Sequence, residues 1–167
     1  MQTFKTDYSM DRLISQVLTF KPQRLVFPYG WCGHIPFAAW LMKLHQPDLF
    51  VELGTHSGNS YFSFCQAAAE YELSALCYAV DTWQGDEHSG EYGADVFGDV
   101  SSYNAQKYAG FSTLMRMRFD EALAYFSDGS IDLLHIDGLH TYEAVKADFE
   151  SWLPKLSDRA IVLFHDI

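Results

Sequence analysis

The stretch LLHIDGLHTYEAVKADF, residues 133–149, places Asp137 and His140 three positions apart, directly after an apolar run. The last residues repeat this arrangement, because IVLFHDI sets His165 and Asp166 after a second apolar run. Carboxylates and imidazoles together can hold a divalent cation. An imidazole can also take a proton from a substrate. Metal binding and general-base chemistry are therefore what these residue types offer.

The side chains can act together only if the two apolar runs are neighbouring strands. Neighbouring parallel strands lie about 4.8 Å apart. We therefore expect Asp137, His165 and Asp166 to converge on one ion across two strand tips. Asp137 could instead be an ordinary turn residue before Gly138, and His140 a solvated loop residue.

The elements needed for this arrangement follow from residue 48 onward, where apolar runs alternate with helical patterns. Such alternation with short connections predicts parallel strands joined by right-handed crossovers. Apolar strand cores predict a sheet covered on both faces. We expect an α/β fold with a Rossmann-like, doubly wound, mostly parallel sheet. Its strands are expected at about 48–54, 75–81, 113–118, 131–137 and 160–166, with helices at about 58–71, 95–108, 120–126 and 141–153.

Residues 1–47 are expected to form an N-terminal helical extension to a domain spanning 48–167. Its helices are predicted at about 8–19 and 34–45, with a Pro- and Gly-punctuated loop between them. The sequence stops directly after its last predicted strand, which leaves a sheet edge bare. We expect either that a second copy covers this edge, giving a homo-oligomer, or that C-terminal strands are missing from a truncated sheet.

The first predicted strand ends in VELGTHSGNS, which contains G-x-x-x-G rather than the dinucleotide fingerprint G-x-G-x-x-G. His56 stands where the fingerprint needs a Gly to admit a pyrophosphate, so NAD and FAD are disfavoured. Glu52 beside the turn would repel phosphate and favour an ammonium or a sulfonium. Asp81 ends the second predicted strand and could accept both hydroxyls of a ribose. These features suit S-adenosylmethionine; a plain α/β domain with a glycine turn is the alternative.

Four blocks then carry a family resemblance: VELGTHSGNSYF, AVDTWQGDEHSGEYG, SIDLLHIDGLHTYEAVKADFESWLPKL and IVLFHDI. They resemble the class I S-adenosylmethionine-dependent methyltransferases over about residues 48–167. Within that class they are most similar to the metal-dependent sugar and small-molecule O-methyltransferases, allied to macrocin O-methyltransferase and the cephalosporin-hydroxylase-like proteins. Such domains often occur beside or fused to glycosyltransferases, so the resemblance implies a glycosyltransferase association.

The resemblance also implies residue roles. The cofactor would contact Glu52, Gly54, Thr55, Gly58, Asp81, Trp83, Phe119 and Asp120. Asp137 would be a metal ligand and His140 the catalytic base. The last-strand pair in that group is usually two carboxylates, whereas this chain has His165 and Asp166. An imidazole there would shift the preferred cation from Mg²⁺ toward Mn²⁺, Fe²⁺ or Zn²⁺.

The expected activity is methyl transfer to a hydroxyl of a sugar or small polyhydroxylated metabolite. A sugar hydroxyl is a poor nucleophile at neutral pH, and a bound divalent cation would lower its pKa and orient it. One alternative is a metal-dependent hydroxylase or hydrolase that uses His140, His165 and Asp137 as a facial set. Another is a non-catalytic binding module that accompanies a glycosyltransferase.

The composition of the chain excludes some classes of partner. The net charge of −11 and the scattered Lys and Arg residues argue against nucleic acid and an anionic membrane surface. The N-terminus lacks signal-peptide features, and the most apolar stretch, 35–42, is too short to span a bilayer. The three cysteines form no CxxC motif, so we expect them to be buried and to pack as small hydrophobic residues. We also expect a cytoplasmic location, because the cysteines suggest no disulfide framework.

Two further expectations concern side chains near the motifs. His135 is interpreted as a core histidine, and Tyr142, Val145, Phe149 and Trp152 as core packing at helical spacing. The acidic loop 82–99 is either a flexible surface loop or a lid. As a lid it would close over the acceptor and stack Trp83 or Tyr92 on a sugar face.

Overall fold

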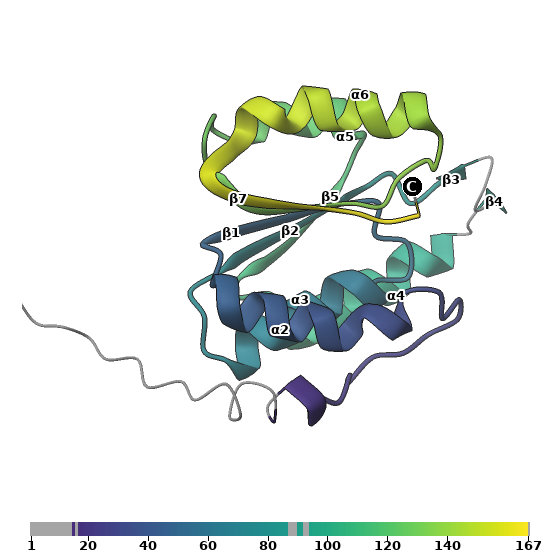
Figure 1. Ribbon diagram of the computed structural model, residues 1–167. Helices are drawn as coiled ribbons and strands as arrows, with labels where there is room; N and C mark the ends of the chain where they lie inside the picture. The colour runs from purple at the N-terminus through teal and green to yellow at the C-terminus, as the bar shows by residue number, and fades with distance from the viewer. Residues whose placement is uncertain (1–14, 16, 87–89, 92–93, 167) are drawn as a thin grey trace, which may run out of the picture.

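A five-stranded parallel sheet lies between two layers of helices (Figure 1). The computed structural model describes residues 15, 17–86, 90–91 and 94–166. The strands are β1 (Leu49–Leu53), β2 (Leu76–Asp81), β5 (Ser112–Arg116), β6 (Ile131–Ile136) and β7 (Leu156–Phe164). Their order across the sheet is β5-β2-β1-β6-β7. All five strands predicted from the sequence are confirmed, and β7 begins earlier than expected.

Helices cover both faces of the sheet, as predicted (Figure 1). On one face lie α2 (Ile35–His45), α3 (Asn59–Glu70) and α4 (Ala94–Lys107); on the other lie α5 (Phe119–Ala122) and α6 (Tyr142–Trp152). Short 3₁₀ turns follow α5 and α6 and precede α2: Leu123–Tyr125, Leu153–Lys155 and Cys32–His34. In the part of the chain that the structure describes, no helix has the length and apolar character needed to cross a membrane.

The strand order reverses direction between β1 and β6. Chain order runs outward through β2 and β5 on one side and through β6 and β7 on the other. In open parallel sheets, ligands bind beyond the carboxyl ends of the strands at such a reversal. A ligand site is therefore expected at the turns that leave β1 and β6.

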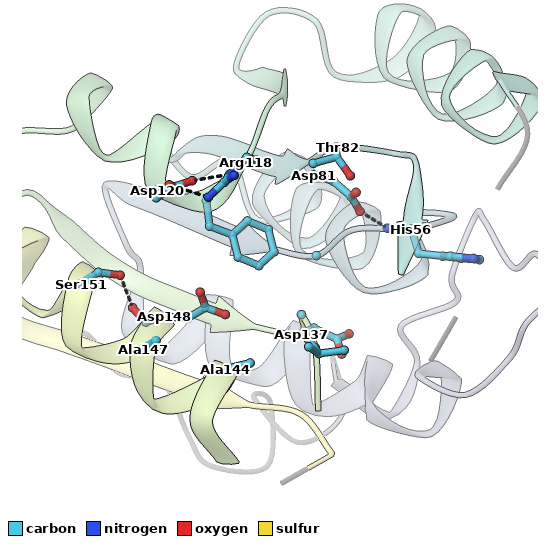
Figure 2. Close-up of a pocket in the computed structure, with 15 residues that line it drawn as sticks. His56, Asp81, Thr82, Arg118, Asp120, Asp137, Ala144, Ala147, Asp148 and Ser151 are labelled. Atoms are coloured by element: carbon cyan, nitrogen blue, oxygen red, sulfur yellow. Dashed lines mark hydrogen bonds and ion pairs between the residues drawn. The ribbon is translucent and has the colours of Figure 1, made fainter. Parts of the chain in front are cut away.

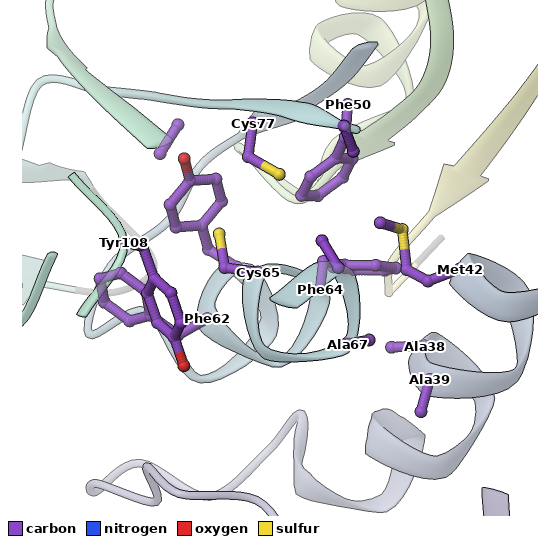
Figure 3. Packing of buried hydrophobic residues seen from close by; sticks show 14 of the residues in the cluster. Ala38, Ala39, Met42, Phe50, Phe62, Phe64, Cys65, Ala67, Cys77 and Tyr108 are labelled. Atoms are coloured by element: carbon purple, nitrogen blue, oxygen red, sulfur yellow. The ribbon is translucent and has the colours of Figure 1, made fainter. Parts of the chain in front are cut away.

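Alternate strand residues enter two separate cores because both faces of a parallel sheet are buried. Phe50 belongs to the cluster beneath α2, α3 and α4, while Val51 belongs to the cluster beneath α5 and α6. Figure 3 shows Ala38 and Ala67 where α2 and α3 meet. Both are fully buried, and their small size allows the two helices to approach closely.

Two of the three cysteines are buried, as the sequence indicates. Cys65 and Cys77 are fully buried in the larger core (Figure 3). Cys32 is only half-buried, at the margin of this core. Burial raises the pKa of Cys65 well above its ordinary value. This thiol is consequently neutral and packs as a small hydrophobe.

The chain before α2 shares the core of the domain. We call residues 21–31 the N-terminal strap. Asn59 donates to the carbonyls of Val26 and Pro28 and accepts from the Val26 amide. Gln66 accepts from the Gln23 amide and donates to the carbonyl of residue 21. Side chains of α3 thus hold the strap by its backbone.

Some expectations meet a different outcome. Tyr142 is 75% exposed, so its predicted place in the core is wrong; as the first residue of α6 it lies beyond the packed face, where Trp152 is fully buried. Gly85–Asp86 and Gly90–Glu91 form a short antiparallel pair, β3–β4, inside the predicted acidic loop. The predicted helix at 8–19 and Tyr92 lie largely or wholly outside the described residues.

Candidate active site

The turn after β1 touches the end of β6 backbone to backbone. Gly54 has a φ of 85°, and a Cβ built on it would lie 2.0 Å from the carbonyl oxygen of Asp137. The Asp137 amide donates to the Leu53 carbonyl at 2.8 Å, which fixes the approach. Only glycine can adopt the left-handed conformation at position 54 and also fit the small space there.

Asp81 holds the same turn from the other side. One carboxylate oxygen accepts from the amides of Thr55 and His56, at 2.8 and 2.9 Å (Figure 2). The other accepts from the Trp83 amide at 2.7 Å. His56 and Trp83 both have a positive φ, so the carboxylate bonds the amides of two strained residues.

Two of the cavities at this edge are lined by Gly54 and Asp137. The larger measures about 800 Å³ (Figure 2). It is lined by Gly54, His56, Asp81, Thr82, Gly85, Arg118, Phe119, Asp120, Asp137, Gly138, Leu139, Ala144, Ala147, Asp148 and Ser151. The smaller measures about 310 Å³ and is lined by Pro28, Gly30, Trp31, Gly54, Thr55, His56, Ser57, Asn59, Ser60, Asp137, Gly138, His140, His165 and Asp166.

The two cavities share a wall. Gly54, His56, Asp137 and Gly138 line both of them. The close approach of Gly54 to Asp137 is therefore the boundary between the two cavities. A group transferred from one ligand to another would cross this boundary.

Asp137 lies between two imidazoles on the side of the smaller cavity. Its Oδ1 is 3.0 Å from His165 Nδ1, a hydrogen bond, and 3.8 Å from His140 Nε2, which is longer than one. Asp166 Oδ2 is 3.5 Å from the same His165 nitrogen. The structure thus brings Asp137, His165 and Asp166 together, as the sequence predicts, and adds His140.

This cluster does not have the form of a metal centre. Among the described residues, no group of three or more His, Cys, Asp and Glu side chains is arranged to hold a metal ion. Asp137 and His165 instead form a direct hydrogen bond. The structure therefore shows no cation site among the described residues, and we derive no step through a metal.

A second carboxylate–imidazole pair is buried beneath the site. Glu52 and His135 are neighbours across β1 and β6, and His135 Nδ1 lies 2.8 Å from Glu52 Oε2. Both side chains are almost wholly inaccessible, and burial raises the pKa of Glu52. The interpretation of His135 as a core histidine is confirmed.

The predicted cofactor residues divide into three groups. Gly54, Asp81, Phe119 and Asp120 line the larger cavity, whereas Thr55 lines only the smaller. Glu52, Gly58 and Trp83 are not among the described residues lining either cavity. Trp83 is 1% exposed and donates to the His56 carbonyl, so it cannot stack on a sugar as expected of a lid residue. The roles of the other residues stay predictions.

Several lining residues carry no motif in the sequence. Pro28, Gly30 and Trp31 of the strap line the smaller cavity, and Arg118 and Asp148 the larger. The only local signal for the strap is its punctuation by Pro and Gly, which indicates a loop and not a binding wall.

The charged residues at the larger cavity perturb one another. Arg118 donates twice to Asp120, at 2.8 and 2.9 Å, and this contact lowers the pKa of Asp120. Burial, followed by the nearby charge of Asp120, raises the pKa of Asp148 to about 6. The cavity therefore contains one carboxylate that titrates close to neutrality.

Comparison with known proteins agrees with this architecture. A family model described as a methyltransferase domain matches residues 51–167. The chain belongs to this methyltransferase domain family. Protein y4gI of Sinorhizobium fredii is 56% identical over 137 residues, which make up 82% of this chain and 15% of y4gI.

Two solved methyltransferases share the fold. The SAH-bound methyltransferase PaMTH1 of Podospora anserina superposes with a TM-score of 0.62 at 14% identity, over 92% of this chain and 60% of PaMTH1. The O-methyltransferase TomG of Streptomyces achromogenes, in complex with SAM, gives 0.60 at 14% identity, over 93% of this chain and 66% of TomG. This methyltransferase domain thus spans about three fifths of the length of PaMTH1 and a small part of y4gI.

The close approach at position 54 predicts a large effect of a single methyl group. We expect Gly54→Ala to lower the free energy of unfolding by more than about 3 kcal/mol, because it adds a backbone clash to the left-handed penalty of about 1–2 kcal/mol. Gly129→Ala is the matched control, since Gly129 has a φ of 69° but open space around its Cβ. Urea unfolding of both variants checks this; equal losses would contradict it.

The raised pKa of Asp148 predicts a pH-dependent stability. Ionisation is disfavoured in the folded state, so folding loses stability as the pH rises from about 4, the unfolded pKa, to about 6. Asp148→Asn should therefore have a higher melting temperature than the parent at pH 7. The difference should vanish below about pH 4. Thermal scans across this range, with the exposed Asp158→Asn as control, test it; a pH-independent difference would contradict it.

Proposed function

We propose that this chain binds S-adenosylmethionine in the larger cavity and catalyses methyl transfer to a hydroxyl held in the smaller one. The observation that carries the proposal is the shared wall of Gly54, His56, Asp137 and Gly138. Membership of the methyltransferase domain family supports it, as does the shared fold of SAM-bound TomG.

The larger cavity suits the methyl donor in size and position. Its volume of about 800 Å³ lies within the range of small-molecule sites, about 300–1,000 Å³. Phe119 offers an apolar surface for the adenine, close to Gly138 of the shared wall, since a Cβ on Gly138 would lie 2.7 Å from its ring. A donor whose methionine end reaches Gly54 would place its methyl group beside the smaller cavity.

The proton-accepting group is His165, positioned by Asp137. An ionised carboxylate only accepts hydrogen bonds, so His165 Nδ1–H donates to Asp137, and Nε2 is left as the acceptor. The hydroxyl gives its proton to Nε2 while its oxygen attacks the methyl carbon. The carbon–sulfur bond breaks as the carbon–oxygen bond forms, and sulfur leaves as the neutral thioether of S-adenosylhomocysteine.

The acceptor is a sugar or a small polyhydroxylated metabolite. Thr55 lines the smaller cavity, is 3% exposed, and its Oγ1 has no hydrogen-bond partner among the described residues. Buried hydroxyls are normally bonded, so a ligand hydroxyl is a fitting partner. Asn59 and Ser60 add further polar groups to the same cavity. A glycosyltransferase partner, implied by the resemblance, stays a prediction.

Calorimetry and kinetics of two histidine variants test this function. We expect S-adenosylhomocysteine to bind the parent, His165→Gln and His140→Gln with equal affinity. Loss of the base should lower the methylation rate of His165→Gln by about 10²–10⁴-fold, with tritiated S-adenosylmethionine and a panel of methyl glycosides. His140→Gln should lose less, because His140 lies 3.8 Å from Asp137.

Three results would contradict the proposal. Absence of heat with S-adenosylhomocysteine would remove the donor site. Full activity of His165→Gln would remove the assigned base and return that role to His140. Loss of turnover on chelation, restored by Mn²⁺, would show metal assistance in place of the direct proton transfer.

A further inference from the structure

We propose that the smaller cavity selects acceptors without negative charge and excludes phosphorylated and carboxylated ones. The inference deepens the proposed function, since it calls the occupant of this cavity the acceptor. It narrows the class to uncharged hydroxylated rings and sets aside sugars that carry a phosphate near the reacting hydroxyl.

The lining of the smaller cavity supplies carboxylates but no strong cation. Asp137 and Asp166 line it, and no Lys or Arg does so among the described residues. Phosphate and carboxylate recognition in proteins depends on Arg and Lys. His140 and His165 are the imidazoles beside these carboxylates, so any proton they carry is matched by a negative charge.

Arg24, a cation of the strap, is not among the residues that line the smaller cavity. The Arg24 guanidinium donates to the carbonyl of Ser57, so it lies behind a lining residue. It also forms an ion pair with Asp99. Its planar face lies 4.8 Å from the Tyr103 ring centroid and 5.5 Å from that of Phe62. The charge of Arg24 is therefore paired with Asp99, and its guanidinium group packs against two aromatic rings.

The amino end of α3 at Asn59 and Ser60 is a feature of the wall that would attract an anion. A helix end is equivalent to about half an elementary charge. Asp137 and Asp166 oppose it with a full charge each, and Asp137 has only 18% of its side chain exposed. The carboxylates therefore decide the sign of the cavity.

The other groups that line the smaller cavity suit a neutral ring. The unpartnered Thr55 hydroxyl can bond a ligand hydroxyl, and Pro28 and Trp31 provide an apolar wall. A volume of about 310 Å³ is at the lower end of the range for small-molecule sites, about 300 Å³. The cavity is accordingly built for a compact, uncharged, hydroxyl-bearing group.

A glycine in the strap allows the inference to be tested by adding charge. Gly30 lines the smaller cavity, its φ lies outside the left-handed region, and a Cβ on it meets nothing within 4 Å. Gly30→Lys should therefore fold and place an ammonium at the cavity. Gly33→Lys is the matched control, because Gly33 has the same open space but does not line the cavity.

The probe is inorganic phosphate, added at about pH 8 to protein saturated with S-adenosylhomocysteine, with the ring signals of His140 and His165 followed by NMR. We expect no saturable change in the parent or in Gly33→Lys. Gly30→Lys should bind phosphate saturably, with a Kd at least about tenfold below the highest phosphate concentration at which the parent and Gly33→Lys show no saturation, equivalent to about 1.4 kcal/mol. Circular dichroism confirms that each variant is folded.

Saturable phosphate binding by the parent at these two histidines would overturn the inference, as would equal phosphate affinity of Gly30→Lys and Gly33→Lys. The phosphate titration and the test of the proposed function can fail independently. If S-adenosylhomocysteine fails to bind, the methyltransferase proposal fails, while the same phosphate titration of the ligand-free protein still reports the charge preference of the smaller cavity.

Discussion

The structure depends on one backbone contact, the approach of Gly54 to the carbonyl of Asp137, which leaves no room for a Cβ. It occurs where the strand order reverses, so the turns after β1 and β6 diverge on either side of it. Asp81 secures the arrangement by accepting the amides of Thr55 and His56. Backbone atoms thus form the boundary between the two cavities, and side chains of the same turns provide the chemistry.

This arrangement explains why the site needs contributions from distant parts of the chain. The sheet edge supplies Asp137 and His165 from neighbouring strands, held together by a 3.0 Å hydrogen bond. The strap closes the smaller cavity with Trp31, whose ring also packs 5.5 Å from His135. Because Asn59 and Gln66 hold the strap by its backbone, its position depends on α3 more than on its own side chains.

The sequence predicted what depends on local pattern. The alternation of apolar runs with helical patterns predicted the five strands and their parallel direction. The positions of Asp137 and His165 at the ends of two strands predicted that these side chains lie close together. The strap wall could not be predicted, because it rests on hydrogen bonds from Asn59 to backbone groups about 30 residues away, which leave no mark on the strap's own residue types. The predicted cation stays a prediction for a related reason: strand spacing brings side chains near one another but does not decide whether they bond each other or an ion.

In the proposed function, the edge around Gly54 and Asp137 binds the methyl donor. Hydrogen–deuterium exchange with and without S-adenosylhomocysteine is the measurement that tests this binding. We expect slower exchange in residues 53–58, 81–85 and 137–140 when the ligand is present. Unchanged exchange in these turns, with protection confined to the apolar surface of α6 and β7 around Phe149 and Phe164, would contradict it.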